Sequence, residues 1–228
     1  MGCKAGMIEF PVGNAVGSGY LAGVEGAEVR PGLILVHEWW GLTDHIKGIA
    51  DRFADEGFVV LAPDLYGSKV TRDAEEAGRL MQSLDQQRAM GILNAAVDYL
   101  KQQGTVRENA IGVAGFCMGG SFALLLACHN KDVGAAAPFY GDVPPDDVLK
   151  DLNAPVLFIG AELDQWITRE KMERLRDAMQ RYGKAGEVVI YPGVNHAFFN
   201  DTRPDVYDEE AAKDAWKRVV DFLTGKLA

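Results

Sequence analysis

The stretch Gly115-Phe116-Cys117-Met118-Gly119-Gly120 decides the fold of this chain. It follows a short apolar run at 110–114 and leads into an apolar segment at 121–127. This order predicts a strand, a tight turn and a helix. Glycines around Cys117 predict a turn so tight that side chains there would clash with the strand and the helix. The turn would expose the Cys117 sulfur at the N-terminus of the helix, where unpaired backbone N–H groups favour a thiolate.

Further apolar runs extend this unit into a sheet. Runs without polar alternation are typical of strands buried on both faces, and they occur at 33–36, 58–61, 134–137, 155–159 and 188–191. Apolar residues with helical spacing lie between them or after them, at 46–53, 90–100 and 212–223. We therefore expect an α/β fold with a mostly parallel central sheet and helices on both faces. The first residues, through Tyr20-Leu21-Ala22, predict a short antiparallel pair at one edge.

Composition narrows the class of protein. The chain has 228 residues, 48% of them hydrophobic, which predicts one domain over 1–228. A net charge of -10 disfavours nucleic acid as a partner. No apolar stretch reaches the roughly 18 residues of a membrane span, and three cysteines without CxxC spacing favour neither disulfides nor structural zinc. We expect a soluble cytoplasmic protein, a monomer or else a dimer, that binds a small molecule.

Two residues downstream of the turn could serve a cysteine nucleophile. Ligands of parallel sheets bind at the carboxyl ends of the strands, and Asp164 and His196 each follow a predicted strand there. The chain order of nucleophile, acid and histidine is typical of the α/β-hydrolase fold. We therefore predict that His196 is the base and that Asp164 orients it. Asp164 could instead start a turn or cap a helix, and Glu162 is its closest competitor as the acid.

The other candidates for this chemistry are weaker. His129 ends the predicted helix after Cys117, His45 opens a helix, and His37 ends a strand beside the proposed site. Cys117 itself could be a small core residue. A dinucleotide site would need G-x-G-x-x-G, which Gly112, Gly115 and Gly119 do not provide.

The loop after the first parallel strand is His37-Glu38-Trp39-Trp40-Gly41. In α/β-hydrolases this loop supplies the second oxyanion N–H, so we predict an oxyanion hole made of the Trp39 and Met118 N–H groups. Glu38 is unexpected, because a charged carboxylate there would oppose catalysis. It could turn outward and pair with a base. Trp39 and Trp40 are either apolar walls or substrate contacts, and the predicted substrate-binding residues are Trp39, Tyr66 and Phe199.

With these residues in view, the chain resembles the dienelactone hydrolase family over most of its length. The resemblance rests on Val36-His37-Glu38, Gly41-Leu42, Asp44-His45-Ile46, Ala62-Pro63-Asp64-Leu65-Tyr66, Gly115-Phe116-Cys117-Met118-Gly119-Gly120 and His196-Ala197-Phe198-Phe199-Asn200-Asp201. It implies an α/β-hydrolase without a large lid domain, a Cys117-His196-Asp164 triad, and hydrolysis of a cyclic enol ester or related small ester without metal or organic cofactor. It also implies that Glu38 takes the thiol proton when substrate arrives.

The chain departs from the family pattern at two positions. Family members that act on chlorocatechol products grip the substrate carboxylate with two arginines, and here those positions hold Ser68 and Asn200. Lys69, Arg72 or Arg203 could substitute. A neutral ester is therefore as well suited as dienelactone. Alternatives to the lactonase are a general carboxylesterase or thioesterase with the same triad, a thiol that senses peroxide by reversible oxidation, and a non-catalytic binding protein on the same fold.

Overall fold

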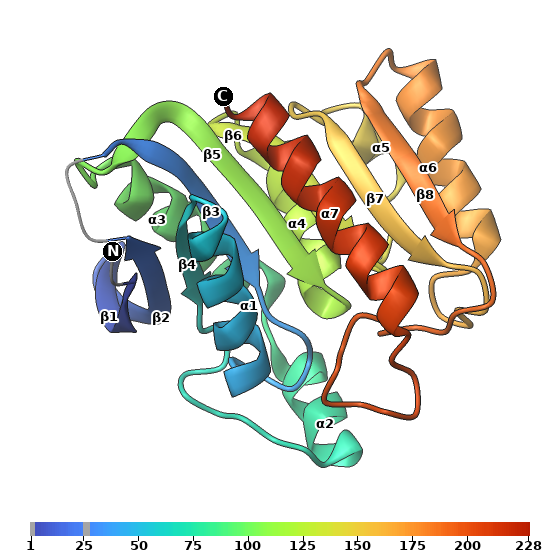
Figure 1. Ribbon diagram of the computed structural model, residues 1–228, viewed down its shortest axis with the longest axis horizontal. Helices are drawn as coiled ribbons and strands as arrows, with labels where there is room; N and C mark the ends of the chain where they lie inside the picture. The colour runs from blue at the N-terminus through green and yellow to red at the C-terminus, as the bar shows by residue number, and fades with distance from the viewer. Residues whose placement is uncertain (1–2, 25–27) are drawn as a thin grey trace.

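An eight-stranded sheet forms the centre of the computed structural model, which describes residues 3–24 and 28–228 (Figure 1). Met1 and Gly2 lie outside the described residues. The strands are β1 (Cys3–Val12), β2 (Ala15–Val24), β3 (Arg30–Val36), β4 (Val59–Pro63), β5 (Val106–Phe116), β6 (Val133–Phe139), β7 (Val156–Ala161) and β8 (Gly186–Tyr191). The helices are α1 (Asp44–Asp55), α2 (Ala74–Ser83), α3 (Gln86–Lys101), α4 (Met118–His129), α5 (Asp146–Leu149), α6 (Arg169–Arg181) and α7 (Glu209–Lys226).

The strand order across the sheet is β1-β2-β4-β3-β5-β6-β7-β8. The six strands from β4 to β8 in this order run parallel. β1 pairs with β2, and β2 with β4, in antiparallel fashion. The expected antiparallel edge pair is therefore present, although each of its strands is ten residues long rather than short.

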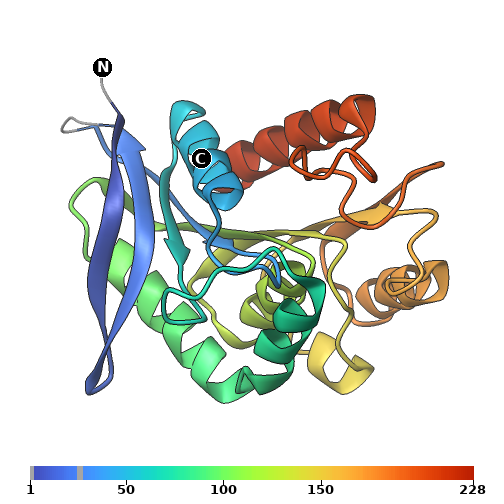
Figure 2. The same cartoon turned by 90° about the horizontal axis from the view of Figure 1, so that it is seen from below.

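Helices cover both faces of the sheet, as predicted. Figure 2 shows α1 and α7 on one face and α3, α4 and α6 on the other. Strand β3 shows why its sequence is apolar throughout: Leu33 and Leu35 pack under α1 and α7, whereas Ile34 and Val36 belong to the opposite core cluster. A strand with two buried faces needs apolar side chains at every position.

Helices α2 and α6 have weaker sequence signals than the helices that were predicted. Helix α6 is rich in charged residues and buries only Met172, Leu175, Ala178 and Met179. Helix α2 buries only Ala77. Their apolar faces are narrow because each packs against the molecule along one side. None of the helices within the described residues is long and apolar enough to span a membrane.

The topology places the functional candidates together. Glu38 follows β3, Cys117 follows β5, Asp164 follows β7 and His196 follows β8. All four strands are parallel, so their carboxyl ends lie along one edge of the sheet. The segments after these strands are therefore the ones that can build a site.

Candidate active site

The turn at Cys117 has the backbone that its glycines require. Cys117 joins β5 to α4 with a φ of 55° and a ψ of -119°, in the region that non-glycine residues rarely occupy. A Cβ atom on Gly115 would overlap the carbonyl oxygen of Gly119. One on Gly119 would overlap the carbonyl oxygen of Val36, on the neighbouring strand β3. These positions have room for hydrogen only, which lets the helix start directly above the strands.

The Cys117 sulfur faces two backbone N–H groups. Those of Met118 and Trp39 both act to lower the pKa of the thiol. Burial has the larger effect, however, and with the charges of Glu38 and Asp164 it raises the pKa of Cys117 to about 12. The N–H groups therefore favour the thiolate, as expected, but burial outweighs their effect. The raised pKa favours the neutral thiol, and the two N–H groups are those predicted for the oxyanion hole.

Asp164 and His196 form a direct pair. The Nδ1 atom of His196 lies 2.6 Å from Oδ2 of Asp164, whose side chain is fully buried. If Nδ1 carries the proton and donates it to the carboxylate, Nε2 is left as an acceptor. Nε2 is buried and has no hydrogen-bond partner within residues 3–24 and 28–228. The histidine therefore presents an unpaired basic nitrogen on the side away from Asp164.

Hydrogen bonds keep Asp164 ionised. Burial alone would raise the pKa of its carboxyl, but the bond and charge of His196 and the N–H groups of Ile167 and Trp166 together lower it. Both N–H groups donate to Oδ1 over 2.9 Å. Glu162, the competing acid, instead binds Arg169 and the N–H of Gly193. Asp164, and not Glu162, is therefore the acid that contacts His196.

Glu38 points into the molecule. Only 3% of the residue is exposed, and its Oε2 accepts a hydrogen bond from Asn200 Nδ2 over 2.8 Å. The alternative in which Glu38 turns outward to pair with a base is therefore wrong. Burial raises the pKa of Glu38 to about 7, against the opposing effects of Asn200 and the Arg203 charge. A carboxyl with this pKa can gain or lose a proton near neutral pH.

Asn200 has a defined orientation. Its Oδ1 atom accepts hydrogen bonds from the backbone N–H of Thr202 over 3.0 Å and from the Thr202 hydroxyl over 2.6 Å. Its amide nitrogen is thereby directed at Glu38. This position, where the family pattern has an arginine that grips the substrate carboxylate, serves the carboxylate of the protein itself. The contact joins residues that are 162 positions apart, so the sequence carried no local signal for it.

His37 holds the loop that carries Glu38. It is fully buried, its Nδ1 lies 2.6 Å from the Glu38 carbonyl oxygen, and its Nε2 accepts the N–H of Leu65 over 3.1 Å. Burial lowers the pKa of His37 and so keeps the ring neutral. A neutral ring can donate a hydrogen bond through Nδ1 and accept one through Nε2 at the same time. His37 therefore positions the β3 loop and the segment after β4 relative to each other.

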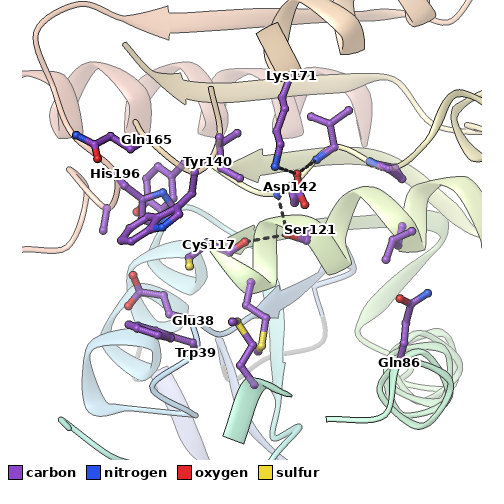
Figure 3. A pocket seen from close by; sticks show the side chains of 18 of the residues that line it. Glu38, Trp39, Gln86, Cys117, Ser121, Tyr140, Asp142, Gln165, Lys171 and His196 are labelled. Atoms are coloured by element: carbon purple, nitrogen blue, oxygen red, sulfur yellow. Dashed lines mark hydrogen bonds and ion pairs between the residues drawn. The ribbon is translucent and has the colours of Figure 1, made fainter. Parts of the chain in front are cut away.

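The candidate residues line one cavity of about 860 Å³. Figure 3 shows Cys117 with His196 and Tyr140 on one side and Glu38 with Trp39 on another. Three of its lining residues, Cys117, Tyr140 and Ala197, have positive φ without being glycine. Such conformations are strained and are typical of functional sites. Within the described residues, no group of three or more His, Cys, Asp or Glu side chains could hold a metal ion.

Two predicted substrate contacts lie elsewhere. Tyr66 is buried beneath Met118, and its hydroxyl lies 3.2 Å from the Met118 sulfur. Phe199 is 3% exposed and packs against the rings of Phe116 and Phe139. Neither is part of the cavity lining, whereas Trp39 and Trp40 both are. Tyr66 and Phe199 are therefore core residues that support the site.

The candidate basic residues differ in their access to this cavity. Arg203 lines it and also lines a smaller neighbouring cavity of about 590 Å³, and it forms an ion pair with Asp205. Arg72 lines the smaller cavity alone, and Lys69 lines neither. Ser68 binds Asp64 through its backbone N–H. Of the three candidates, Arg203 has the access that a substrate anion would need.

Known proteins share this architecture. The family model described as "Dienelactone hydrolase family" matches residues 18–227. A relative from Aquifex pyrophilus, "Protein usf", is 37% identical over 95% of this chain and 96% of its own length. A "Putative carboxymethylenebutenolidase" from Aquifex aeolicus is 34% identical over 95% of this chain and 96% of its own length.

A solved structure agrees with these relatives. The crystal structure of a "Putative Dienelactone Hydrolase" from Klebsiella pneumoniae superposes with a TM-score of 0.91 at 28% identity, covering 98% of this chain and 99% of that one. The predicted α/β-hydrolase fold is thereby confirmed, as is the predicted class of enzyme, a carboxylic ester hydrolase. The chain belongs to the dienelactone hydrolase family.

Proposed function

We propose that this protein hydrolyses carboxylic esters or lactones through an acyl-enzyme on Cys117. His196 is the general base and acid, Asp164 holds its tautomer, and the N–H groups of Met118 and Trp39 bind the oxyanion. The observation that carries the proposal is the His196–Asp164 contact of 2.6 Å, combined with an unpaired Nε2 in the cavity that Cys117 lines.

In the first half-reaction the Cys117 thiolate attacks the ester carbonyl carbon. A carbon–sulfur bond forms, and the carbonyl oxygen becomes an oxyanion opposite the Met118 and Trp39 N–H groups. The carbon–oxygen ester bond then breaks. The proton that left the thiol for Glu38 passes on to Nε2 of His196 and from there to the leaving alkoxide, which for a lactone remains part of the same molecule.

In the second half-reaction water attacks the thioester. His196 takes one proton from the water through Nε2, and a second tetrahedral oxyanion forms at the same N–H groups. Its collapse breaks the carbon–sulfur bond and releases the acid, and the Nε2 proton passes to the leaving sulfur, which restores the Cys117 thiol and the neutral imidazole. Asp164 stabilises the imidazolium in both halves without accepting its proton, because its low pKa keeps it ionised.

Glu38 supplies the activation step in this proposal. A thiol with a pKa of about 12 is a poor nucleophile, and part of that increase comes from the Glu38 charge. When the thiol proton moves to Glu38, the carboxyl becomes neutral. Its charge then no longer raises the pKa of Cys117. Its own pKa of about 7 makes it able to accept the proton at neutral pH. The raised thiol pKa also argues against a peroxide sensor, which depends on an accessible thiolate.

The two described cysteines of α4 and its cap provide a matched test. Cys117→Ala should reduce kcat/KM for p-nitrophenyl acetate by at least about 10⁴-fold, because the nucleophile is lost. Cys128→Ala is the control, since Cys128 is a buried residue at the other end of α4 and lines neither cavity. Retained activity in Cys117→Ala would contradict the proposal.

A comparison of substrates separates a lactonase from a general esterase. We propose that simple esters are hydrolysed at least as fast as cis-dienelactone, because Ser68 and Asn200 provide no cation for its carboxylate. Rates on cis-dienelactone and on p-nitrophenyl esters measure this directly. If the parent instead prefers the lactone and Arg203→Gln loses this preference, Arg203 binds the carboxylate of the lactone.

A further inference from the structure

The cavity is longer than a small lactone requires. Helix α4 exposes only Ser121, Leu125 and His129, spaced four residues apart, and all three line the cavity. With Cys117 as the cap, this stripe runs over twelve residues, or about 18 Å at 1.5 Å per residue. The site therefore continues as a groove along α4, which we call the α4 groove and whose far end on the helix is His129. Gln86, which also lines the cavity, lies beyond Ser121 as seen from Cys117 (Figure 3).

The walls of the α4 groove are largely hydrocarbon. Its apolar lining consists of Leu125 of α4, Met81 of α2, and Pro144, Pro145 and Val148 from the segment around α5. Met81 is 39% exposed, so part of its apolar surface remains in water. Burial of such surface by a ligand is favourable by about 25 cal/mol per Å². The groove thus favours an apolar occupant over a charged one.

The polar groups beside this lining already have partners. The Ser121 hydroxyl accepts the N–H of Asp142 over 2.7 Å, and Asp142 pairs with Lys171 over 2.8 Å. Arg174 fixes the Pro144 side of the groove by donating to the carbonyl oxygens of Pro144 and Val143, each over 2.7 Å. The wall is therefore held in place without a ligand, and few polar atoms along it would need a polar substrate group.

The position of His196 decides which half of an ester enters the groove. In Figure 3, His196 lies on one side of Cys117, whereas Ser121 and Gln86 lie on the other. His196 must protonate the leaving oxygen, so the alcohol part belongs on its side. The acyl part then points along α4.

We infer, on the basis of the proposed function, that the α4 groove binds the unbranched acyl chain of the substrate. An extended chain advances about 1.2 Å per bond, so a groove of about 18 Å accepts roughly eight to twelve carbons with room at the open end. The preferred substrates are medium-chain acyl esters or thioesters with a small or polar leaving group. A six-carbon lactone would leave most of the groove empty.

The test is a pair of chain-length series, both measured below the concentration at which the esters form micelles. For p-nitrophenyl esters from acetate to dodecanoate, kcat/KM should rise by roughly fourfold per methylene until about ten carbons. For acetates of longer and longer alcohols it should stay nearly flat. Equal gains in both series, or a flat acyl series, would overturn the inference.

Two tryptophan substitutions locate the chain. Leu125 lies about 12 Å along α4 from Cys117, and a Trp ring there leans back toward Cys117, so Leu125→Trp should lower the decanoate-to-acetate ratio of kcat/KM at least tenfold. His129→Trp, at an exposed position at the far end, should reduce only the ratio for dodecanoate, and it serves as the second test if Leu125→Trp fails to fold. Val16→Trp is the matched control, because Val16 is 69% exposed on the edge hairpin and lies outside the cavity lining. An unchanged ratio in both groove variants would contradict the assignment.

This result is separable from the proposed function. If Cys117→Ala loses hydrolysis of p-nitrophenyl acetate while the parent shows no dependence on acyl length, the triad stands and the groove assignment fails. If hydrolysis survives in Cys117→Ala, the proposed function fails whatever the chain-length series shows.

Discussion

Asp164 and Glu38 are two buried carboxylates that act on the same thiol, yet their pKa values move in opposite directions. Asp164 is 6% exposed and its pKa is lowered, whereas Glu38 is 3% exposed and its pKa rises to about 7. Burial raises both. The difference lies in the number of donors, because two backbone N–H groups and His196 meet Asp164, while one amide of Asn200 meets Glu38.

This difference gives each carboxylate a separate task. A carboxylate with several donors stays charged and can hold an imidazolium. A carboxylate with one donor in a dry site changes protonation near neutral pH and can exchange a proton with a neighbour. Asp164 thus supplies a fixed charge and Glu38 a movable proton, although their side chains are similar. The backbone N–H groups make the difference, because two of them donate to Asp164.

Among the substitutions that test this comparison of carboxylates, Asp164→Asn should have the largest effect. The amide leaves the imidazole without its anion and favours the wrong tautomer, so kcat/KM for p-nitrophenyl acetate should fall by about 10³- to 10⁴-fold. Glu162→Gln is the matched control, two residues away and bound to Arg169 and Gly193 instead. We expect a change of less than about threefold there. A larger loss in the control would assign the acid to Glu162.

The second prediction concerns the movable proton. Glu38→Gln should lower kcat/KM at pH 8 by about 10²-fold, because general base catalysis at the thiol is lost. In the parent, kcat/KM should rise through a pH near 7 as Glu38 ionises, and the mutant should lack this rise. Alkylation of Cys117 by iodoacetamide should accelerate with a substrate analogue in the parent only. Equal alkylation rates in both proteins would show that Glu38 does not activate the Cys117 thiol.

The third prediction is a gain in stability from the same substitution. The pKa of Glu38 is about 7 in the folded protein and 4.5 ordinarily, so its favourable contribution is present below pH 4.5 and is lost as pH rises through 7. Glutamine avoids this loss. The advantage of Glu38→Gln in free energy of unfolding should therefore grow by roughly 2 to 3 kcal/mol between pH 5 and pH 8. Urea melts at the two pH values measure it, and a constant difference would show that Glu38 is ionised throughout.

The smallest effect is expected at Asn200. Asn200→Leu removes the single donor to Glu38, so the pKa of Glu38 should rise further and the rise in kcat/KM should move upward by about one pH unit. Thr202→Val keeps the amide and loses only one bond that orients it, so its shift should be smaller. A downward shift in Asn200→Leu would mean that another group sets the pKa.

Much of this arrangement follows from sequence. The glycines around Cys117 predict the turn because only hydrogen fits beside the carbonyl oxygens of Val36 and Gly119. The positions of Asp164 and His196 after their strands predict their meeting at the sheet edge. These features depend on local backbone requirements and on strand order, both of which leave marks in the residue pattern.

Features that depend on distant packing were not predictable. The Asn200–Glu38 contact and the pKa of Cys117 depend on how deeply each group is buried, which no local pattern records. Phe199 lies three residues after His196, and Tyr66 follows strand β4, yet their rings point into the core. The exposed stripe of α4 was also hidden, because it is visible only when the surrounding elements cover the rest of the helix.

The central claim is that the acyl group passes through the Cys117 sulfur. Rapid acid quench of the enzyme during turnover of a p-nitrophenyl ester, followed by mass spectrometry of the digested protein, tests it. We predict an increase equal to the acyl group on the peptide that contains Cys117, formed with the first burst of p-nitrophenol and absent in Cys117→Ala. Turnover without any adduct on this peptide, or with the adduct on another residue, would contradict the account.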